Sequence, residues 1–439
     1  MIVDLSEKKV KKNMVLGTVY RGFSMILSFV YVPVILFYLG EVKFGIWTTI
    51  LNILSWISHF DIGIGNGLRN KLVEGLVKDR DKDKAKKYIS SAYIMLGCII
   101  FFVVVSGCVL SFFIDWNSLF GIKTIDENLR LIMQISIILV GSNFVLSLCK
   151  SIYYALQENS KVGLMGIIQQ LLMIVGVSIL IKSGNPSILI IACLYGFSEI
   201  FVSLLFSIFL FKKDNCFIPS FEYYSKKEAK ETTGLGFLFF ISQIASLILF
   251  STDNLIIAHF IGPAEVTSYS IVNKLFTVGT GMFTMLVAPY WSRTAAAKAE
   301  NDYSMIRKSL NSMYKLFLLG IVGALFLMIV FKPIAYIWLR QNLDYQYGLI
   351  FLMMVYSIIY MWNAIYSQIV NGLSLMKVLV PVAIIQSIIN IPLSLLFLLF
   401  FDMGAVGVLL GTVISTLVSA IVTPIYVHKE IKNNLCIKC

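Results

Sequence analysis

The chain has 439 residues, of which 58% are hydrophobic and only 14% are charged, and its formal net charge is +12. A water-soluble protein of this size needs roughly 25% charged residues to cover its surface, so the composition excludes an ordinary soluble enzyme. Apolar segments long enough to cross a hydrocarbon core of about 30 Å recur along the whole length.

These segments predict an all-α polytopic membrane protein with about twelve transmembrane helices. The first follows the basic segment MIVDLSEKKVKKNM. It is too long for a signal peptide and no small-residue cleavage site precedes Pro33, so we expect a first span with a cytoplasmic N-terminus. The predicted spans cover residues 15–38, 44–66, 89–113, 129–155, 162–182, 188–211, 233–257, 265–289, 310–331, 347–370, 379–400 and 405–427.

The distribution of Lys and Arg predicts the orientation. With the N-terminus inside, most of the 36 Lys and Arg residues fall in segments that face the cytoplasm, and the opposite side keeps few. Both termini are therefore expected in the cytoplasm. The positive charge follows from topology and from contact with anionic lipid, so it does not indicate a nucleic-acid partner.

The first predicted lobe, residues 1–212, carries ionisable groups inside its spans. Each costs about 2.5–3.5 kcal/mol in hydrocarbon, so such groups normally face the bundle interior or a watery cavity. Arg21, Asp61 and Lys150 lie about 9–10 Å from the cytoplasmic ends of the first, second and fourth spans, at 1.5 Å per residue. Arg21 and Asp61 either form an inner gate or simply join two helices, and Lys150 lines a cavity or reaches the interface. Glu199 has no evident partner and is either a neutral packed acid or a proton carrier.

The second span ends in HFDIGIGNGLRNK, residues 59–71. Its glycines loosen the last turns and permit close helix approach, while Asn66 satisfies backbone groups that this frees. Arg69 and Lys71 anchor the end among lipid headgroups. We expect a gate region here.

A second six-helix lobe, residues 232–439, follows a cytoplasmic linker at 213–231. Leu39-Gly40-Glu41 opens the second span and Ile261-Gly262-Pro263 opens the eighth, and each span leads into a cytoplasmic segment of similar length. This rhythm predicts parallel repeats related by a pseudo-two-fold axis along the membrane normal. Asp253 and Asn254 lie near the outer end of the seventh span, as a structural cap or an ion-coupling site. Lys274 lies near the midplane of the eighth span and Lys315 lies in the ninth.

Polar side chains form stripes at helical spacing on several spans. They indicate either helix packing or a central hydrated cleft with cations near its inner end. Lys and Arg bind phosphate oxygens, and amide and aromatic groups suit hydroxyl-rich sugar rings. The candidate sugar contacts are Asn143, Tyr356, Tyr360 and Asn363.

No catalytic constellation is present in the sequence. The three histidines are far apart, the seven cysteines have no metal-ligand spacing, and there is no nucleotide-binding glycine motif. The outer loops are also short for a sugar-polymerising enzyme. We therefore expect neither an enzyme nor a cofactor or metal site.

Several motifs together resemble a known family. Residues 60–71, Thr252-Asp253-Asn254, Gly262-Pro263 and Ala288-Pro289-Tyr290-Trp291-Ser292 are similar to those of bacterial O-antigen-unit flippases. These flippases belong to the multidrug/oligosaccharidyl-lipid/polysaccharide exporter superfamily. The resemblance covers nearly the whole chain.

The resemblance implies translocation of undecaprenyl-pyrophosphate-linked oligosaccharide from the inner to the outer leaflet of the bacterial inner membrane, by alternating access. It assigns cavity-cation roles to Arg21, Lys150 and Lys274 and a gate to residues 61–71. Lys315 is a fourth candidate cation because it lies at a similar depth in the other lobe. We expect a monomer that contacts membrane lipids, with a polysaccharide polymerase and a chain-length regulator as candidate partners.

Three other classes compete with this interpretation. A cation-coupled drug or metabolite antiporter of the same superfamily would need a mainly acidic cleft. An integral-membrane polysaccharide polymerase would need larger outer loops and an acid/base pair. A major-facilitator transporter would need different glycine and arginine spacing in the loop GLVKDRDKDK.

Overall fold

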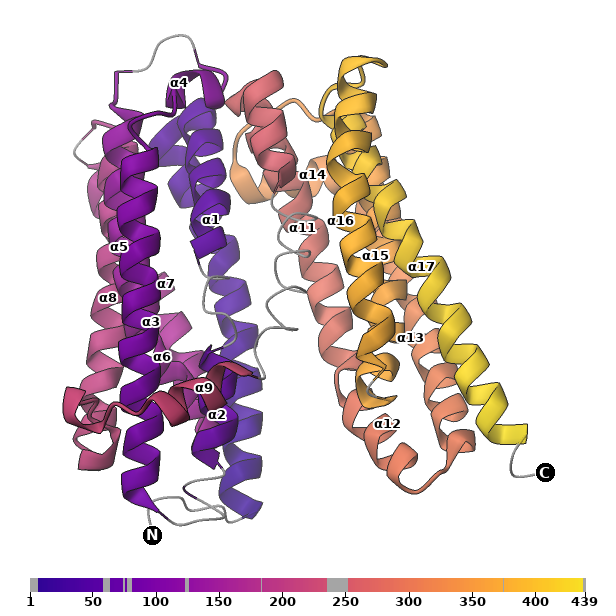
Figure 1. Ribbon diagram of the computed structural model, residues 1–439. Coiled ribbons are helices and arrows are strands. Elements are labelled where there is room, and N and C mark those ends of the chain that lie inside the picture. The colour runs from indigo at the N-terminus through magenta and orange to yellow at the C-terminus, as the bar shows by residue number, and fades with distance from the viewer. Residues whose placement is uncertain are drawn as a thin grey trace. The chain divides into compact units, whose positions relative to one another are not determined.

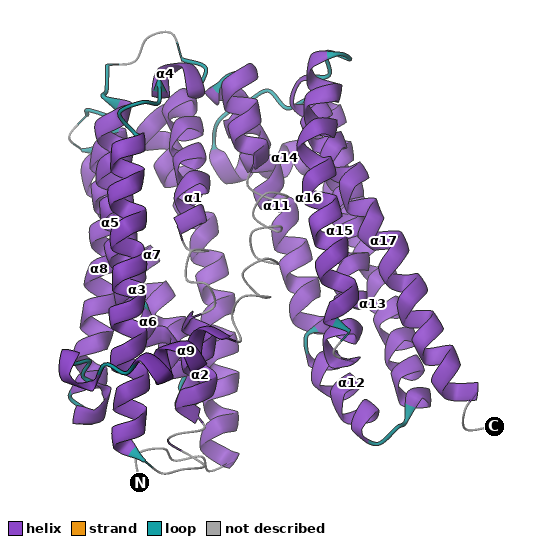
Figure 2. Ribbon diagram, in the orientation of Figure 1, coloured by secondary structure: helices purple, strands orange, loops and turns teal. Residues whose placement is uncertain are grey.

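The computed structural model describes residues 7–57, 64–73, 76, 81–122, 126–182, 184–234, 252–373 and 375–436. Within these residues every regular element is helical (Figure 2). The chain divides into two compact units, Met1–Gln243 and Ile244–Cys439.

Long antiparallel helices pack side by side in the first unit (Figure 1). The longest, α1, bends at Gly40, whose φ of 72° and ψ of 170° interrupt the helical backbone. Glycine adopts this conformation without the steric cost that a Cβ would add. The helices of this unit are α1 (Glu7–Ile57), α2 (Ile64–Val73), α3 (Lys82–Leu110), α4 (Trp116–Leu119), α5 (Leu129–Leu146), α6 (Leu148–Ala155), α7 (Asn159–Ile181), α8 (Ile188–Phe211), η2 (Asn215–Phe217), η3 (Phe221–Tyr223) and α9 (Lys226–Gly234).

The second unit begins, in its described part, with a helical segment at residues 252–260. Gly262, with φ of 132°, then turns the chain into α11, which has Pro263 in its first turn. Proline suits this place because the first helical amide has no intrahelical acceptor. The remaining helices are α11 (Pro263–Val287), α12 (Pro289–Ala299), α13 (Tyr303–Ile329), α14 (Phe331–Leu339), α15 (Tyr347–Leu373), α16 (Met376–Leu399) and α17 (Gly404–Cys436).

Ten helices in the described part of the chain are long and apolar enough to cross a membrane. The first of them, Val15–Ile57, contains both the first predicted span and most of the second, joined at the Gly40 bend. The predicted seventh span falls mostly on residues outside the described set. The all-helical, multi-pass fold is therefore confirmed, while the total of twelve and the pseudo-two-fold symmetry stay predictions.

The segment that we expected to link the lobes is folded against α3 of the first unit. Ser220 N and Ser225 N donate to Ser90 Oγ and Ser91 Oγ, each at 3.0 Å. Further along α9, Tyr88 OH donates to Glu231 Oε2 at 2.7 Å. These bonds hold η2, η3 and α9 beside the end of the bundle where α2 also packs.

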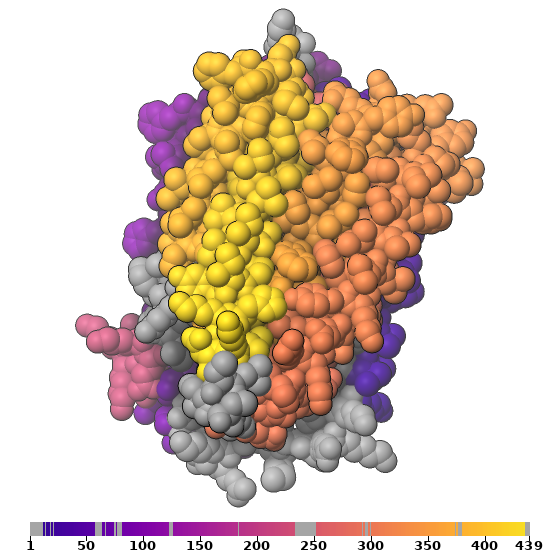
Figure 3. Space-filling model, turned by 90° about the vertical axis from the view of Figure 1, so that its right-hand side faces the viewer, coloured from indigo at the N-terminus to yellow at the C-terminus, as the bar shows by residue number. Residues whose placement is uncertain are grey.

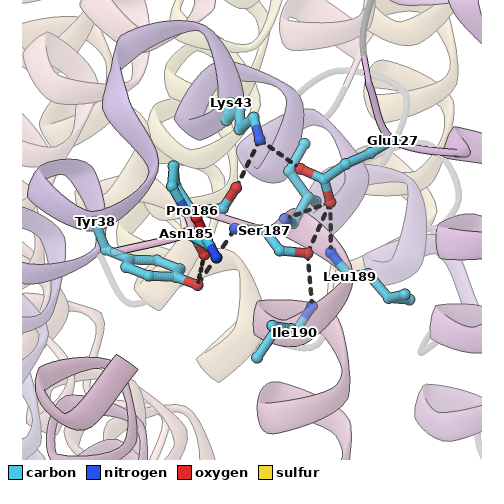
Figure 4. Close-up of polar contacts among 9 residues, drawn as sticks. Tyr38, Lys43, Glu127, Asn185, Pro186, Ser187, Leu189 and Ile190 are labelled. Carbon is cyan, nitrogen blue, oxygen red and sulfur yellow. Dashed lines mark hydrogen bonds and ion pairs between the residues drawn. The ribbon is translucent and has the colours of Figure 1, made fainter. Parts of the chain in front are cut away.

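At the opposite end of this unit, Glu127 joins α1 to the start of α8 (Figure 4). Its Oε1 accepts from Lys43 Nζ at 2.7 Å, and its Oε2 accepts from Ile188 N at 2.8 Å and Leu189 N at 3.1 Å. A carboxylate at a helix N-terminus satisfies amides that have no partner within the helix and interacts favourably with the helix dipole. The cluster fixes one end of the bundle that carries the candidate site.

Candidate substrate and ion-coupling sites

Asn143 of α5 joins two polar side chains of α8 inside the first unit. Its amide nitrogen donates to Glu199 Oε2 at 2.8 Å, and its amide oxygen accepts from Ser203 Oγ at 2.7 Å. Asn143 and Ser203 are both buried. The sequence left Glu199 without a partner, and the structure supplies one from another helix. A carboxyl group held this way inside a bundle is suited to gain and lose a proton or cation.

A break in the fourth predicted span positions Lys150. Helix α5 ends at Leu146, α6 begins at Leu148, and Ser147 Oγ donates to Phe144 O at 2.7 Å. Lys150 is half-buried on α6, within electrostatic range of Glu199. Among the described residues its ammonium group has no hydrogen bond or ion pair. The first unit therefore contains, at Lys150, a cation that a ligand can bind.

Arg69 extends this positive region onto α2. Its guanidinium lies 5.3 Å from the ring centroid of Tyr154, one helical turn beyond Lys150 on α6. This contact fixes the guanidinium by a cation–π interaction while the side chain stays exposed. The structure thus places two predicted cationic residues on the packed helices α2 and α6.

Three predicted residues of the gate and cavity cannot be placed in full. Asp61 lies outside the described residues, and the side chains of Arg21 and Asn66 are also outside them. The second span also has a predicted polar stripe, Thr48, Asn52, Ser55 and His59, and its described members are bonded within their own helix. Thr48 Oγ1 donates to Gly45 O at 2.9 Å and Asn52 Nδ2 donates to Thr48 O at 2.8 Å. The Arg21–Asp61 pair stays a prediction.

The second unit contains a polar pocket of about 270 Å³ among α11, α15, α17 and the helical segment at 252–260. Tyr356 and Tyr360, which we predicted to contact sugar, both line it. Thr277 and Gly281, which belong to the predicted polar stripe of the eighth span, line it as well. The pocket also contains residues that sequence analysis did not select: Tyr269, Asn273, Thr280, Ser357 and Thr412. An acid, three phenols, an amide and several hydroxyl groups therefore meet in one cavity.

Asp253 is the acidic centre of this pocket and is only 4% exposed. Its Oδ2 accepts from Tyr269 OH at 2.7 Å, and Thr412 Oγ1 lies 3.1 and 3.0 Å from its two carboxylate oxygens. Asn390 Nδ2 donates to Thr412 Oγ1 at 2.9 Å, and Thr252 Oγ1 lies 3.4 Å from Asn390 Oδ1. The carboxylate thus belongs to a network that spans four helical segments.

The donor set decides which cations this network suits. No group of three or more His, Cys, Asp or Glu side chains comes together within the described residues. Among the described residues, the oxygen atoms around Asp253 belong to neutral hydroxyl and amide groups, and its carboxylate supplies the only formal charge of the network. One negative charge with neutral oxygen donors suits a proton or a monovalent cation better than a divalent metal.

The other predicted residues of this unit are not among the residues that line the pocket. Lys274 is half-buried on α11, one residue from the pocket-lining Asn273, and has no hydrogen bond or ion pair with any described side chain. Lys315 is exposed on α13. Asn363 Nδ2 donates to Thr416 O at 3.3 Å, and Asn254 is half-buried beside Asp253.

A family model described as "Polysaccharide biosynthesis protein" matches residues 10–295. The chain belongs to this polysaccharide biosynthesis protein family. A relative from Salmonella typhimurium, provisionally named an O-antigen transporter, is 23% identical over 86% of both chains. Another from Yersinia pseudotuberculosis, provisionally named an O-antigen export protein, is 21% identical over 91% of both. These names describe transporters and no enzyme, as we expected.

Solved structures place this member of the polysaccharide biosynthesis protein family in a known fold class. An inward-facing multidrug resistance MATE family transporter of the MOP superfamily matches with a TM-score of 0.77, at 16% identity over 95% of this chain and 98% of that one. The lipid II flippase MurJ, in an inward closed conformation, matches with a TM-score of 0.72, at 17% identity over 94% and 87%. The fold that the resemblance implied is therefore confirmed, and the protein is a multi-pass membrane protein of that fold.

Proposed function

We propose that the protein is a flippase that carries lipid-linked oligosaccharide diphosphate across the bacterial inner membrane. Its family and the names of its curated relatives support transport in polysaccharide biosynthesis. The substrate enters from the inner leaflet and leaves in the outer leaflet as the protein alternates between states open to either side. A polymerase and a chain-length regulator would act on the released units.

The observation that carries this proposal is the environment of Lys274. A half-buried lysine inside a membrane-spanning helix, with no acidic partner among the described residues, is costly unless a ligand compensates its charge. Lys150 of the first unit is also half-buried and makes no hydrogen bond or ion pair among the described residues, although Glu199 lies within electrostatic range of it. A diphosphate supplies the missing negative charge, because ammonium groups form charge-assisted hydrogen bonds with phosphate oxygens.

The pocket near Lys274 suits the sugar part of such a substrate. Asn273 lies next to Lys274 on α11, and Tyr356 and Tyr360 face it from α15. Amides and phenols donate and accept hydrogen bonds, and their ring faces can cover the apolar faces of sugars. A site for phosphate therefore adjoins a site for hydroxyl-rich rings on one helix.

Asp253 is the coupling residue of this proposal, and Glu199 is a second acid of the same kind. Binding of a proton or monovalent cation at Asp253 would alter its bonds to Tyr269 and Thr412. These bonds connect the 252–260 segment to α11 and α17, so the ion changes the packing of helices that line the pocket. A bound ion can shift a conformational equilibrium only through such state-dependent contacts.

Complementation of a deletion strain tests the function. Deleting the gene should abolish surface polysaccharide and cause lipid-linked repeat units to accumulate on the cytoplasmic side. Lys274→Gln should fail to restore export, while Lys274→Arg, which keeps the charge, should restore most of it. Full export with Lys274→Gln would show that transport does not need the charge of this lysine. Normal surface polysaccharide in the deletion strain would contradict the proposed function.

The buried acid of the pocket favours one second candidate, a cation-coupled antiporter for drugs or metabolites. Asp253, with Tyr269 and Tyr356 in the same pocket, could bind an organic cation through its charge and the aromatic rings. The same deletion strain separates the two functions. An antiporter predicts altered drug sensitivity with unchanged surface polysaccharide.

A further inference from the structure

A groove of about 590 Å³ lies between α13 and α17 of the second unit. Arg307, Asn311 and Tyr314 line it from α13, and His428 and Lys432 line it from α17. We call this feature the α13–α17 groove. It is separate from the pocket around Asp253, with which it shares no residue.

The lining of the α13–α17 groove is basic. The side chains of Arg307 and Lys432 are exposed, and no described lining residue is acidic. The nearby Glu430 of α17 lies within electrostatic range of Tyr303 on α13, but it is not among the lining residues, and Arg307 and Lys432 outnumber it. Its Oε1 accepts from Asn434 Nδ2 at 3.2 Å. The positive charge of the groove is therefore available to a ligand.

Aromatic side chains fix the inner wall of the groove. Tyr366 OH and Tyr314 OH lie 3.1 and 3.4 Å from His428 Nε2, and the two hydroxyl groups lie 2.5 Å apart. Trp362 stacks on Tyr314 with ring centroids 5.7 Å apart, and its Nε1 donates to Ala420 O at 3.0 Å. The polar groups are thus held in place by three helices before any ligand binds.

The same helix faces become apolar as they continue away from the groove. On α13, Leu318 and Val322 follow Tyr314 at helical spacing, and they are 63% and 61% exposed. On α17, Ile425 and Ile421 precede His428 at the same spacing, and they are 60% and 58% exposed. Figure 3 shows this face, with α17 in yellow beside the coral end of α13. In a membrane protein such a surface faces acyl chains.

We propose that the α13–α17 groove binds the phosphate headgroup of an anionic phospholipid of the surrounding bilayer. Arg307 and Lys432 hold the phosphate by charge, and Asn311 and Tyr314 supply further hydrogen-bond donors. The acyl chains lie on the apolar continuation of α13 and α17. Charge complementarity and the open, bilayer-facing surface select a bilayer lipid, because a basic pocket between helices at a membrane surface is a headgroup site.

Native mass spectrometry of the full-length protein tests this site. The protein is released from detergent with equal amounts of phosphatidylglycerol and phosphatidylcholine that have the same acyl chains. We expect the double variant Arg307→Gln/Lys432→Gln to retain about tenfold less phosphatidylglycerol than the native protein, with phosphatidylcholine unchanged. The matched control is Lys308→Gln/Lys429→Gln, which removes two exposed cations from the same turns outside the groove. It should retain phosphatidylglycerol normally.

Two results would overturn the proposal. Equal losses in the two double variants would mean a general charge effect and no specific site. The second result comes from a parallel measurement with a polyprenyl diphosphate. If Arg307→Gln/Lys432→Gln lost only that ligand and still retained phosphatidylglycerol, the groove would bind the substrate carrier. Thermal unfolding confirms that each variant is folded, and Lys432→Gln against Lys429→Gln repeats the test if a double variant is not. The measurement does not depend on flipping, so either proposal can fail alone.

Discussion

Thr412 Oγ1 lies 3.1 and 3.0 Å from the two carboxylate oxygens of Asp253, although 159 residues separate them in the chain. The contact joins α17 to the segment that leads into α11 and closes one side of the polar pocket. Hydrogen bonds to a buried charged group are stronger than those between neutral groups. The occupancy of this carboxylate by a proton or cation therefore affects the packing of α17.

Asp253→Asn tests the coupling role, because it keeps the shape of the side chain and removes its charge. We expect transport of a fluorescent polyprenyl-diphosphate sugar in proteoliposomes to fall at least about tenfold, since bonds to a charged group contribute about 1.5–3 kcal/mol. The remaining transport should no longer respond to a proton or sodium gradient.

Asp402→Asn is the matched control for Asp253→Asn. Asp402 is exposed in the same unit and has φ of 50°, a conformation that asparagine also adopts readily. Its substitution should leave transport and gradient dependence unchanged. A gradient response that survives in Asp253→Asn would place coupling elsewhere, with Glu199 as the next residue to test.

The fold class follows from sequence because its signals are local. A run of apolar residues must satisfy its backbone hydrogen bonds within one helix, so length and hydropathy alone locate a membrane span. The break between α5 and α6 and the bend at Gly40 are harder to predict than the spans themselves. Of the two, only the bend had a signal in the sequence, the glycine of the motif Leu39-Gly40-Glu41.

The pocket was predicted only in part. Tyr356 and Tyr360 share a helix face, so their periodicity indicated a common surface. Thr412 and Asn390 resemble the many polar residues that bond within their own helix, and no local pattern marks them as partners of Asp253. Such partners are set by tertiary packing and leave no local pattern in the sequence. Glu199 had no predicted partner for the same reason, and the packing of α5 on α8 supplies Asn143.

Glu127→Ala tests the clamp between α1 and α8. The substitution leaves the Lys43 ammonium without its carboxylate and removes the acceptor of the first amides of α8. We expect the free energy of unfolding to fall by about 2 kcal/mol, the sum of a lost helix cap and a lost charged hydrogen bond. Thermal unfolding in detergent measures this as a lower midpoint.

The neighbouring Asp126→Ala is the control, because Asp126 is exposed. It should leave the midpoint within a degree or two of the native value. A double-mutant cycle with Lys43→Ala isolates the ion pair, and additive losses would contradict an interaction between the two side chains.

Gly67→Ala tests the contact between α2 and α9. A Cβ at this position would lie 2.0 Å from the backbone oxygen of Thr232, so one of the two helices must move. We expect a loss of about 1–3 kcal/mol in stability, measured as a lower thermal midpoint, because overpacking against backbone cannot be relieved by a rotamer change. Gly97→Ala is the control: its Cβ meets nothing within 4 Å, and alanine is the better helix former. Equal midpoints for the two variants would show that α9 does not pack on α2.

The environment of Glu158, between α6 and α7, should make the stability of the protein depend on pH. Its Oε1 accepts from Lys213 Nζ at 2.6 Å, and its Oε2 lies 3.0 Å from Lys161 Nζ. Burial alone would raise the pKa of this carboxyl, but the hydrogen bonds and charges of the two lysines outweigh it and hold the pKa below the usual value of 4.5. A lowered pKa means that the ionised form is favoured by folding, so the pair stabilises the protein above the unfolded pKa.

This stabilisation is lost as the pH falls through the lowered pKa, because the folded protein must then take up a proton at Glu158. The difference in unfolding midpoint between the native protein and Glu158→Gln should therefore be full at pH 7 and shrink below about pH 4.5. Glu222→Gln, at an exposed carboxyl of the same unit, should show no such change. A midpoint difference for Glu158→Gln that stays constant from pH 7 to pH 4 would mean that the two lysines do not stabilise the ionised carboxyl in the folded protein.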